Sequence, residues 1–185
     1  GLINDWWKFT IQSTAAPDDP DPQQYLAANP DVRAAYGNDT AAALTHYRDL
    51  GWAEGRPTEL PAATLASGYY SVQGEQGYVW SDGNQFFATH ADPQTLRLEA
   101  KGNGQYNLRG PGQWLSTDGT VHGSGIDPAN EVTYQLLDLG GGQFALTDRG
   151  SYVFPDYNAG GFLTGNPGLI NDWWKFTIQS TAAPD

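Results

Sequence analysis

The stretch Leu136-Leu-Asp-Leu-Gly-Gly-Gly-Gln-Phe-Ala-Leu146 has apolar runs on both sides of three consecutive glycines. Glycine readily adopts the positive φ angles of tight turns, so residues 140–142 are expected to connect the two strands of a β-hairpin. Alternating apolar residues in the flanking runs predict strands with one buried face. Short runs of this kind, broken by Gly, Asp-Gly or Asn, begin near Leu65 and predict a turn-rich β-domain.

The apolar pattern recurs along this part of the chain. The segment Phe144-Ala-Leu146 corresponds to Tyr70-Ser-Val72 and Tyr106-Asn-Leu108, at spacings of 36 and 38 residues. Two further sets keep the same register: Tyr78-Val79, Trp114-Leu115 and Tyr152-Val153, and then Leu96-Arg-Leu98, Tyr134-Gln-Leu136 and Trp174-Lys-Phe176. Three copies of a four-strand unit can close into a barrel capped by hairpins, which leaves few strand edges exposed. The sequence therefore predicts a mainly β protein with a β-trefoil fold.

Two motifs connect this predicted domain with a known family. Trp114-Leu-Ser-Thr-Asp-Gly119 and Leu136-Leu-Asp-Leu-Gly-Gly-Gly-Gln-Phe-Ala-Leu146 resemble repeats of the fascin-like branch of the β-trefoils. The resemblance extends over residues 62–181. It implies a single compact domain made of three similar units.

An identical segment occurs at both ends of the chain, as residues 1–18 and 168–185. Divergence would have left substitutions, so the chain is expected to be one period of 167 residues from a tandem array, followed by the start of the next period. An engineered duplication is the alternative. In this interpretation residues 1–18 are the terminal strand and linker of the preceding repeat, and residues 182–185 begin the next linker.

The duplicated segment contains the last strand that the trefoil requires. We expect the C-terminal copy to seal the barrel near Tyr70, through Trp173, Trp174, Phe176 and Ile178. The N-terminal copy then has no place in this barrel, so residues 2–14 are expected to complete a preceding repeat or a neighbouring subunit. The residues of this inter-repeat strand are Trp6, Trp7, Phe9 and Ile11.

Residues 19–61 are predicted to form a linker and a helical spacer. Three prolines and three acidic residues within 15–22 favour an extended linker. Helices are expected at Tyr25, from Pro30 to Gly37 with Asn29 as the cap, and from Thr40 to Leu50 with Asn38 or Asp39 as the cap. We expect the aromatic residues of this module to pack against a neighbour: Tyr25, Tyr47 and Trp52.

This module also resembles a known element. Its motifs are Tyr25-Leu-Ala-Ala-Asn-Pro-Asp-Val32, His46-Tyr47 and Gly51-Trp-Ala-Glu-Gly-Arg56. They are similar to a short helical repeat of large secreted bacterial proteins, often found alongside calcium-binding repeats. The resemblance implies an extracellular or cell-surface location and supplies no catalytic residue.

The net charge of −12, with only nine Lys and Arg, argues against nucleic-acid binding. The absence of Cys excludes disulfides and thiolate metal sites. No apolar run is long enough to span a bilayer. Strong acidity without Cys suits a secreted protein and fits the predicted location.

Catalytic and metal-binding motifs are missing from the sequence. No nucleophile elbow, phosphate loop or His-Glu-x-x-His segment is present, and His46, His90 and His122 lack zinc-ligand spacing. We therefore expect no enzyme activity and no cofactor. Calcium is the alternative, because Asp18, Asp19 and Asp21 crowd together, but a solvated acidic linker is favoured since no calcium loop motif occurs.

Three acidic residues recur at matching positions of the units: Asp82, Asp118 and Asp156. Asp beside Gly or Asn is typical of tight turns, which is the favoured interpretation. The functional alternative is glycan binding, in which Trp80 with Asp82, or Tyr157 with Asp156, presents a carboxylate beside an aromatic ring.

These observations favour a repeat unit of an extracellular bacterial filament, surface layer or giant adhesin, whose partners are identical repeats or subunits. The alternative is a carbohydrate-binding, lectin-like β-trefoil module whose repetition supplies avidity.

Overall fold

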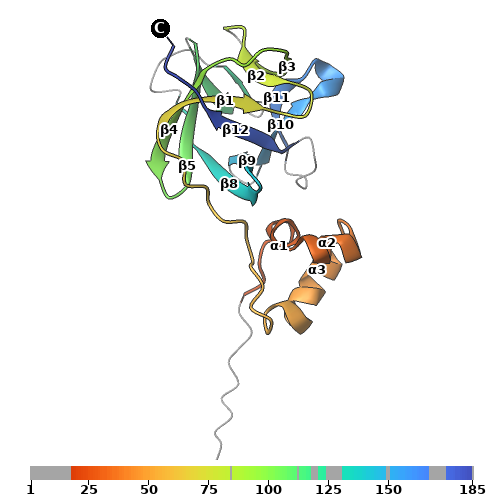
Figure 1. Ribbon diagram of the computed structural model, residues 1–185. Helices are drawn as coiled ribbons and strands as arrows, with labels where there is room; N and C mark the ends of the chain where they lie inside the picture. Colours follow the sequence, from red (N-terminus) through yellow and green to blue (C-terminus); the bar gives the residue numbers. More distant parts are fainter. Residues whose placement is uncertain are drawn as a thin grey trace, which may run out of the picture.

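The structure, a computed structural model, describes residues 18–83, 85–111, 113–117, 121–123, 131–148, 151–166 and 174–184. Five residues of the predicted inter-repeat and barrel-closing strands lie outside these ranges: Trp6, Trp7, Phe9, Ile11 and Trp173. In the described ranges, three short α-helices come first and a twelve-stranded sheet follows. Figure 1 shows the helices gathered at one end of the barrel.

The helical module contains α1 (Pro22–Ala28), α2 (Pro30–Tyr36) and α3 (Thr40–His46). Asp21 caps α1 by accepting hydrogen bonds from the amides of Gln23 and Gln24, so the predicted extended linker ends earlier than expected. Asp39 caps α3 in the same way, and Gly37 ends α2 with a φ of 64°. The caps satisfy amides that a short helix cannot pair internally.

Asn29 occupies the N-cap position of α2, as the sequence predicted, but its side chain makes no capping hydrogen bond. Its side-chain amide instead donates hydrogen bonds to the carbonyl oxygens of Tyr25 and Pro57, both at 2.8 Å. Asn29 is buried, so these bonds satisfy an amide that has left water and fix the segment after the helices against α1.

The prediction that α3 continues to Leu50 as one apolar stripe is wrong. The chain changes at Tyr47 to a π-helical turn, η2 (Tyr47–Gly51), in which the Trp52 amide donates to the Tyr47 carbonyl at 2.9 Å. Because a π-helical turn contains more residues than an α-helical turn, the residues that follow it no longer lie on the apolar face of α3. Leu50 is consequently 52% exposed and Trp52 41% exposed, so Trp52 does not share the buried face of Tyr47.

Tyr25 and Tyr47 pack inside the helical module itself. Their rings meet edge to face with centroids 5.4 Å apart, in a cluster with Leu26, Val32 and Ala43. The Tyr25 hydroxyl is 2.8 Å from Nδ1 of His46. The module thus has its own small core and does not depend on a neighbouring repeat to bury these two aromatic rings.

The strands fall into three groups of four. The first contains β1 (Gly68–Gln73), β2 (Tyr78–Ser81), β3 (Phe86–His90) and β4 (Leu96–Gly102). The second contains β5 (Gln105–Gly110), β6 (Gln113–Thr117), β7 (Val121–Gly123) and β8 (Tyr134–Gly140). The third contains β9 (Gln143–Asp148), β10 (Ser151–Asp156), β11 (Phe162–Asn166) and β12 (Phe176–Ser180).

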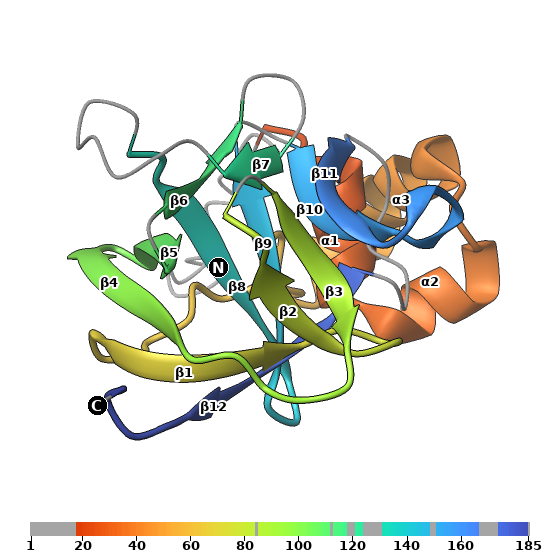
Figure 2. The same ribbon diagram turned by 90° about the horizontal axis from the view of Figure 1, so that it is seen from above.

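The first and last strands of each group form a closed antiparallel barrel. Around the ring, β1 pairs with β4, β4 with β5, β5 with β8, β8 with β9, β9 with β12, and β12 with β1. The middle strands pair as the hairpins β2–β3, β6–β7 and β10–β11. Strands β3, β7 and β11 of these hairpins lie side by side across one end of the barrel (Figure 2). This is a β-trefoil, as the sequence predicted.

Equivalent residues of the three units occupy equivalent places in the core. Val79, Leu115 and Val153 are each at most 1% exposed. The centre of the barrel is lined by side chains from all three units: Val72, Leu98, Tyr106, Leu108, Tyr134, Leu136, Leu146 and Ile178. Residues that recur with the threefold sequence period therefore pack together in the centre of the barrel.

Two tyrosines of the barrel differ in how their hydroxyl groups are satisfied, and this leads to a prediction. The Tyr106 hydroxyl accepts from the Leu65 amide at 2.6 Å and donates to the Ala63 carbonyl at 3.1 Å. The hydroxyl of Tyr134, which is fully buried, finds no hydrogen-bond partner within the described part of the chain.

An unpaired buried polar group such as the Tyr134 hydroxyl destabilises the folded state by roughly 1–3 kcal/mol. We expect Tyr134→Phe to raise the free energy of unfolding by about 1 kcal/mol.

Tyr106→Phe is the matched control for this prediction. It removes the same atom but breaks paired hydrogen bonds, so it should lower the free energy of unfolding by about 1 kcal/mol. Urea denaturation of both variants measures the two changes. Equal destabilisation by Tyr134→Phe and Tyr106→Phe would show that the Tyr134 hydroxyl is paired after all.

Candidate functional site

An aromatic surface lies on the β2–β3 hairpin. Trp80 and Phe87 are directly opposite each other in the two strands, and their rings stack with centroids 5.2 Å apart and an interplanar angle of 25°. The His90 ring lies 5.4 Å from the Trp80 ring. Trp80 and Phe87 are half-buried and His90 is exposed. We call these three residues the hairpin aromatic face; it offers apolar ring surface beside a polar imidazole.

Two of the predicted glycan-binding carboxylates have structural roles in turns. Oδ1 of Asp82 accepts a hydrogen bond from the Gln85 amide at 2.8 Å, and Oδ1 of Asp156 accepts from the Asn158 amide at 3.1 Å. Both bonds stabilise the turn that follows the carboxylate. Asp118 lies outside the described residues.

Tyr157 also connects parts of the trefoil. It begins the short 3₁₀-helix η4 (Tyr157–Ala159), and its hydroxyl accepts a hydrogen bond from the Gln76 amide at 3.1 Å. Burial raises the pKa of this hydroxyl. The side chain therefore links the β10–β11 connection to the β1–β2 turn.

The residues predicted to close the barrel have two different positions. Phe176 and Ile178 are in β12, where Phe176 lies opposite Phe144 of β9 and Ile178 lies opposite Val72 of β1. Trp174 precedes β12 and is outside the barrel core. Its ring stacks on Phe154 at 5.4 Å and lies 5.4 Å from the Tyr152 ring.

Trp174 belongs to the junction between the barrel and the helical module. The buried cluster around it contains Leu60, Leu137, Ala145 and Tyr152, and the helix residues Ala27 and Ala28 pack against that cluster. The side-chain amide of Gln24 in α1 donates to the Tyr152 hydroxyl at 2.6 Å. Burial, together with the charge of Asp21, raises the pKa of Tyr152 to about 12. The module is thus held on the third unit by both apolar and polar contacts.

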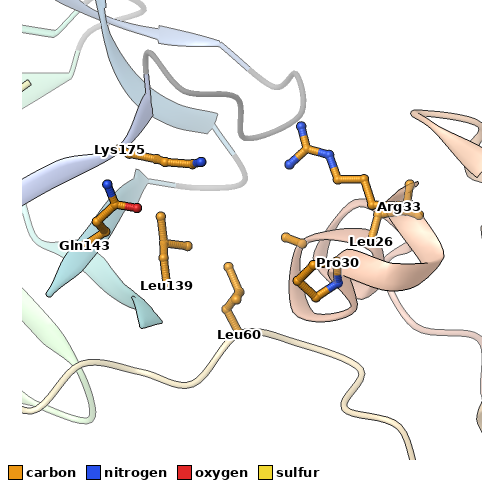
Figure 3. A pocket seen from close by; sticks show the side chains of 8 residues that line it. Leu26, Pro30, Arg33, Leu60, Leu139, Gln143 and Lys175 are labelled. Atoms are coloured by element: carbon orange, nitrogen blue, oxygen red, sulfur yellow. The ribbon is translucent and has the colours of Figure 1, made fainter. Parts of the chain in front are cut away.

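A pocket of about 170 Å³ opens at this junction. Figure 3 shows that helix side chains form one wall and barrel side chains the other, with Arg33 and Lys175 extending from opposite sides. The remaining lining residues are mostly apolar: Leu26, Ala27, Pro30, Leu60, Leu139 and Gln143.

Two of the three acidic residues near the linker, Asp19 and Asp21, have protein partners. Asp19 forms an ion pair with Arg48, which lowers the pKa of the Asp19 carboxyl, and Asp21 caps α1. Within the described ranges, no three His, Asp or Glu side chains gather in a metal-binding group. His46 bonds to Tyr25, and Nδ1 of His90 lies 2.8 Å from the Asp92 carbonyl oxygen.

No helix in the described part of the chain combines the length and apolarity that crossing a bilayer requires.

Sequence reasoning missed two features of these surfaces. Phe87 completes the hairpin aromatic face, and its only signal is its place across the predicted turn from Trp80. Arg33 and Lys175 are far apart in the sequence, so only the docking of the module on the barrel brings them to one pocket. No local pattern could have found that pair.

Comparison with known proteins supports the fold alone. No family model and no curated protein matches the sequence. One similar solved structure is a mosquitocidal holotoxin, with 12% identity and a TM-score of 0.52; the match covers 64% of this chain and 18% of the toxin. Another is SeviL bound to the asialo-GM1 saccharide, with 17% identity and a TM-score of 0.51; the match covers 63% of this chain and 100% of SeviL. A third is a Polyporus squamosus lectin bound to Neu5Acα2-6Galβ1-4GlcNAc, with 14% identity and a TM-score of 0.50; the match covers 64% of this chain and 50% of the lectin. Their likeness agrees with the β-trefoil topology of the described strands.

Proposed function

We propose that this chain is a carbohydrate-binding β-trefoil module. The observation that carries the proposal is the hairpin aromatic face, where the half-buried rings of Trp80 and Phe87 stack beside the exposed His90. Aromatic faces provide apolar contact area for the C–H face of a sugar ring, and an imidazole can bond to a hydroxyl. Asp82 contributes by holding the neighbouring turn, and is not itself proposed as a ligand.

The structural comparisons are consistent with this proposal. Two of the similar structures, SeviL and the Polyporus squamosus lectin, are described as saccharide complexes. At identities of 17% and 14% they share the fold with this chain, so the position of its sugar site is inferred from its own side chains.

The second candidate function is that of a repeat in an extracellular array, such as a filament, surface layer or adhesin. The specific observation is that β12 fills the gap between β1 and β9 with one copy of a segment present twice in the sequence. The other copy would supply the same strand to another barrel. An array of glycan-binding trefoils would gain avidity, so the two functions are compatible.

A glycan array probed with the full chain and with Trp80→Ala tests the carbohydrate proposal. We expect the wild-type chain to bind a restricted set of glycans and Trp80→Ala to lose at least tenfold in affinity for them, an effect of roughly 1.4 kcal/mol. Trp52→Ala, which removes an exposed tryptophan of the helical module, is the control and should bind as the wild type does. Absence of binding at millimolar sugar would overturn the carbohydrate function.

A different observation tests the array proposal. Electron microscopy of the native material should show beads or fibres with a regular repeat. A native product with a single trefoil would contradict it.

A further inference from the structure

We infer that the pocket between the helical module and the barrel binds a small monocarboxylate with an apolar body of about six carbon atoms. The inference rests on charge, lining and size at this junction, and it is independent of the carbohydrate proposal. We call the site the junction pocket.

The charge of the pocket is opposite to that of the whole chain. The net charge is −12, yet among the described residues the two ionisable side chains that line the junction pocket are both cations, Arg33 and Lys175. Both are half-buried, and Figure 3 shows them reaching toward the same space from the two walls. No carboxylate of the described residues forms an ion pair with Arg33. A carboxylate in this space would accept a charge-assisted hydrogen bond from Arg33, and the positive charge of Lys175 on the opposite wall would attract it further.

The rest of the lining selects an apolar body. Five of the eight lining residues are apolar: Leu26, Ala27, Pro30, Leu60 and Leu139. Among these described lining residues, Gln143 is the single neutral polar side chain and none is aromatic. A sugar ring would leave most of its hydroxyl groups unpaired against these residues, which costs free energy. An aliphatic chain would instead bury apolar area, which is favourable.

The volume limits the size of the ligand. A cavity of about 150 Å³ in another protein accommodates benzene, a six-carbon molecule. The junction pocket, at about 170 Å³, therefore fits a body of about six carbons, with the carboxylate at the cationic rim. Inorganic phosphate and acetate satisfy the charge but leave the apolar wall uncovered.

The pocket joins two parts of the fold, so binding should also affect stability. Leu26 and Arg33 belong to the helices, whereas Leu139 lies in β8 and Lys175 directly precedes β12. A ligand that contacts both walls binds the docked arrangement in preference to the unfolded chain and so raises the melting temperature.

Isothermal titration calorimetry of the full chain with hexanoate tests the inference. We expect saturable binding, at least tenfold weaker in Arg33→Gln and in Lys175→Gln, because each substitution removes one positive charge from the wall of the pocket. Arg97→Gln, which changes an arginine paired with Glu99 elsewhere on the barrel, is the matched control and should bind normally. Circular dichroism verifies that every variant is folded.

Ligand comparisons on the wild-type chain keep the test decisive if a variant fails to fold. We expect hexan-1-ol to bind at least tenfold more weakly than hexanoate, and acetate, phosphate and glucuronate likewise. Hexanoate should also raise the melting temperature. No hexanoate binding at ten millimolar, or equal binding of acetate, phosphate or glucuronate, would overturn the inference; neither outcome bears on the glycan array.

Discussion

Phe176→Ala is expected to lower the free energy of unfolding by about 3–5 kcal/mol. Phe176 is 1% exposed, lies opposite Phe144 of β9 and belongs to the main core. Its removal leaves a cavity where the last strand closes the barrel. Because small domains have total stabilities of roughly 5–15 kcal/mol, the variant should be largely unfolded in mild urea. Equilibrium unfolding followed by tryptophan fluorescence measures the change.

The duplication provides a matched control within the same chain. Phe9 is the identical position of the N-terminal copy and lies outside the described residues. Since the gap between β1 and β9 is occupied by Phe176 and its strand, we expect Phe9→Ala to leave the unfolding midpoint of the isolated chain unchanged. Comparable destabilisation by both substitutions would contradict the assignment of the C-terminal copy to the barrel.

Tyr25→Ala is expected to unfold the helical module while the trefoil remains intact. Tyr25 is fully buried, contacts Tyr47 edge to face and bonds to His46 through its hydroxyl. Loss of such a buried ring lowers the free energy of unfolding by about 3–5 kcal/mol. Because three helices of seven residues are too short to be stable on helix propensity alone, the module should then unfold. Amide hydrogen exchange should show protection lost across α1 to α3 and retained in the barrel strands.

Trp52→Ala is the control for Tyr25→Ala. Trp52 is a large aromatic residue of the same module but is 41% exposed after the η2 turn. We expect exchange in α1 to α3 to remain close to that of the wild type. Loss of protection in Trp52→Ala equal to that in Tyr25→Ala would mean that burial does not determine the stability of this module.

The barrel was predictable because its signal is repeated. Spacings of 36 and 38 residues identify Val72, Leu108 and Leu146, which all line the barrel centre. Each unit supports the interpretation of the other two, so errors in single strands matter little. The fascin-like assignment within the trefoils stays a prediction, because no family model matches.

The helical module was less predictable because its ends depend on local hydrogen bonds. The buried Asn29 amide bonds to Pro57, 28 residues away, so Asn29 stands at the N-cap position of α2 without the side-chain capping bond that its place before Pro30 suggested. The π-helical turn at Tyr47 likewise moves Leu50 and Trp52 to the surface, although their spacing fits an α-helical stripe. Neither event has a local sequence signal as strong as Asp39 before α3.

The candidate sites were only partly predictable, for a related reason. Trp80 is detectable as an aromatic residue beside a turn, but whether Asp82 faces a ligand or its own turn depends on the Gln85 amide. The junction pocket requires the docking of two separately folded parts and so has no sequence pattern at all.

The most direct test of the glycan site is the nuclear magnetic resonance spectrum of the tryptophan indole N–H groups during titration with a glycan selected by the array. The chain has seven tryptophans, and Trp80→Phe and Trp174→Phe assign two of their signals. We predict that the Trp80 signal shifts in a saturable manner while the signal of Trp174, buried at the junction, does not. An unchanged Trp80 signal while the glycan binds would contradict the hairpin aromatic face as the carbohydrate site.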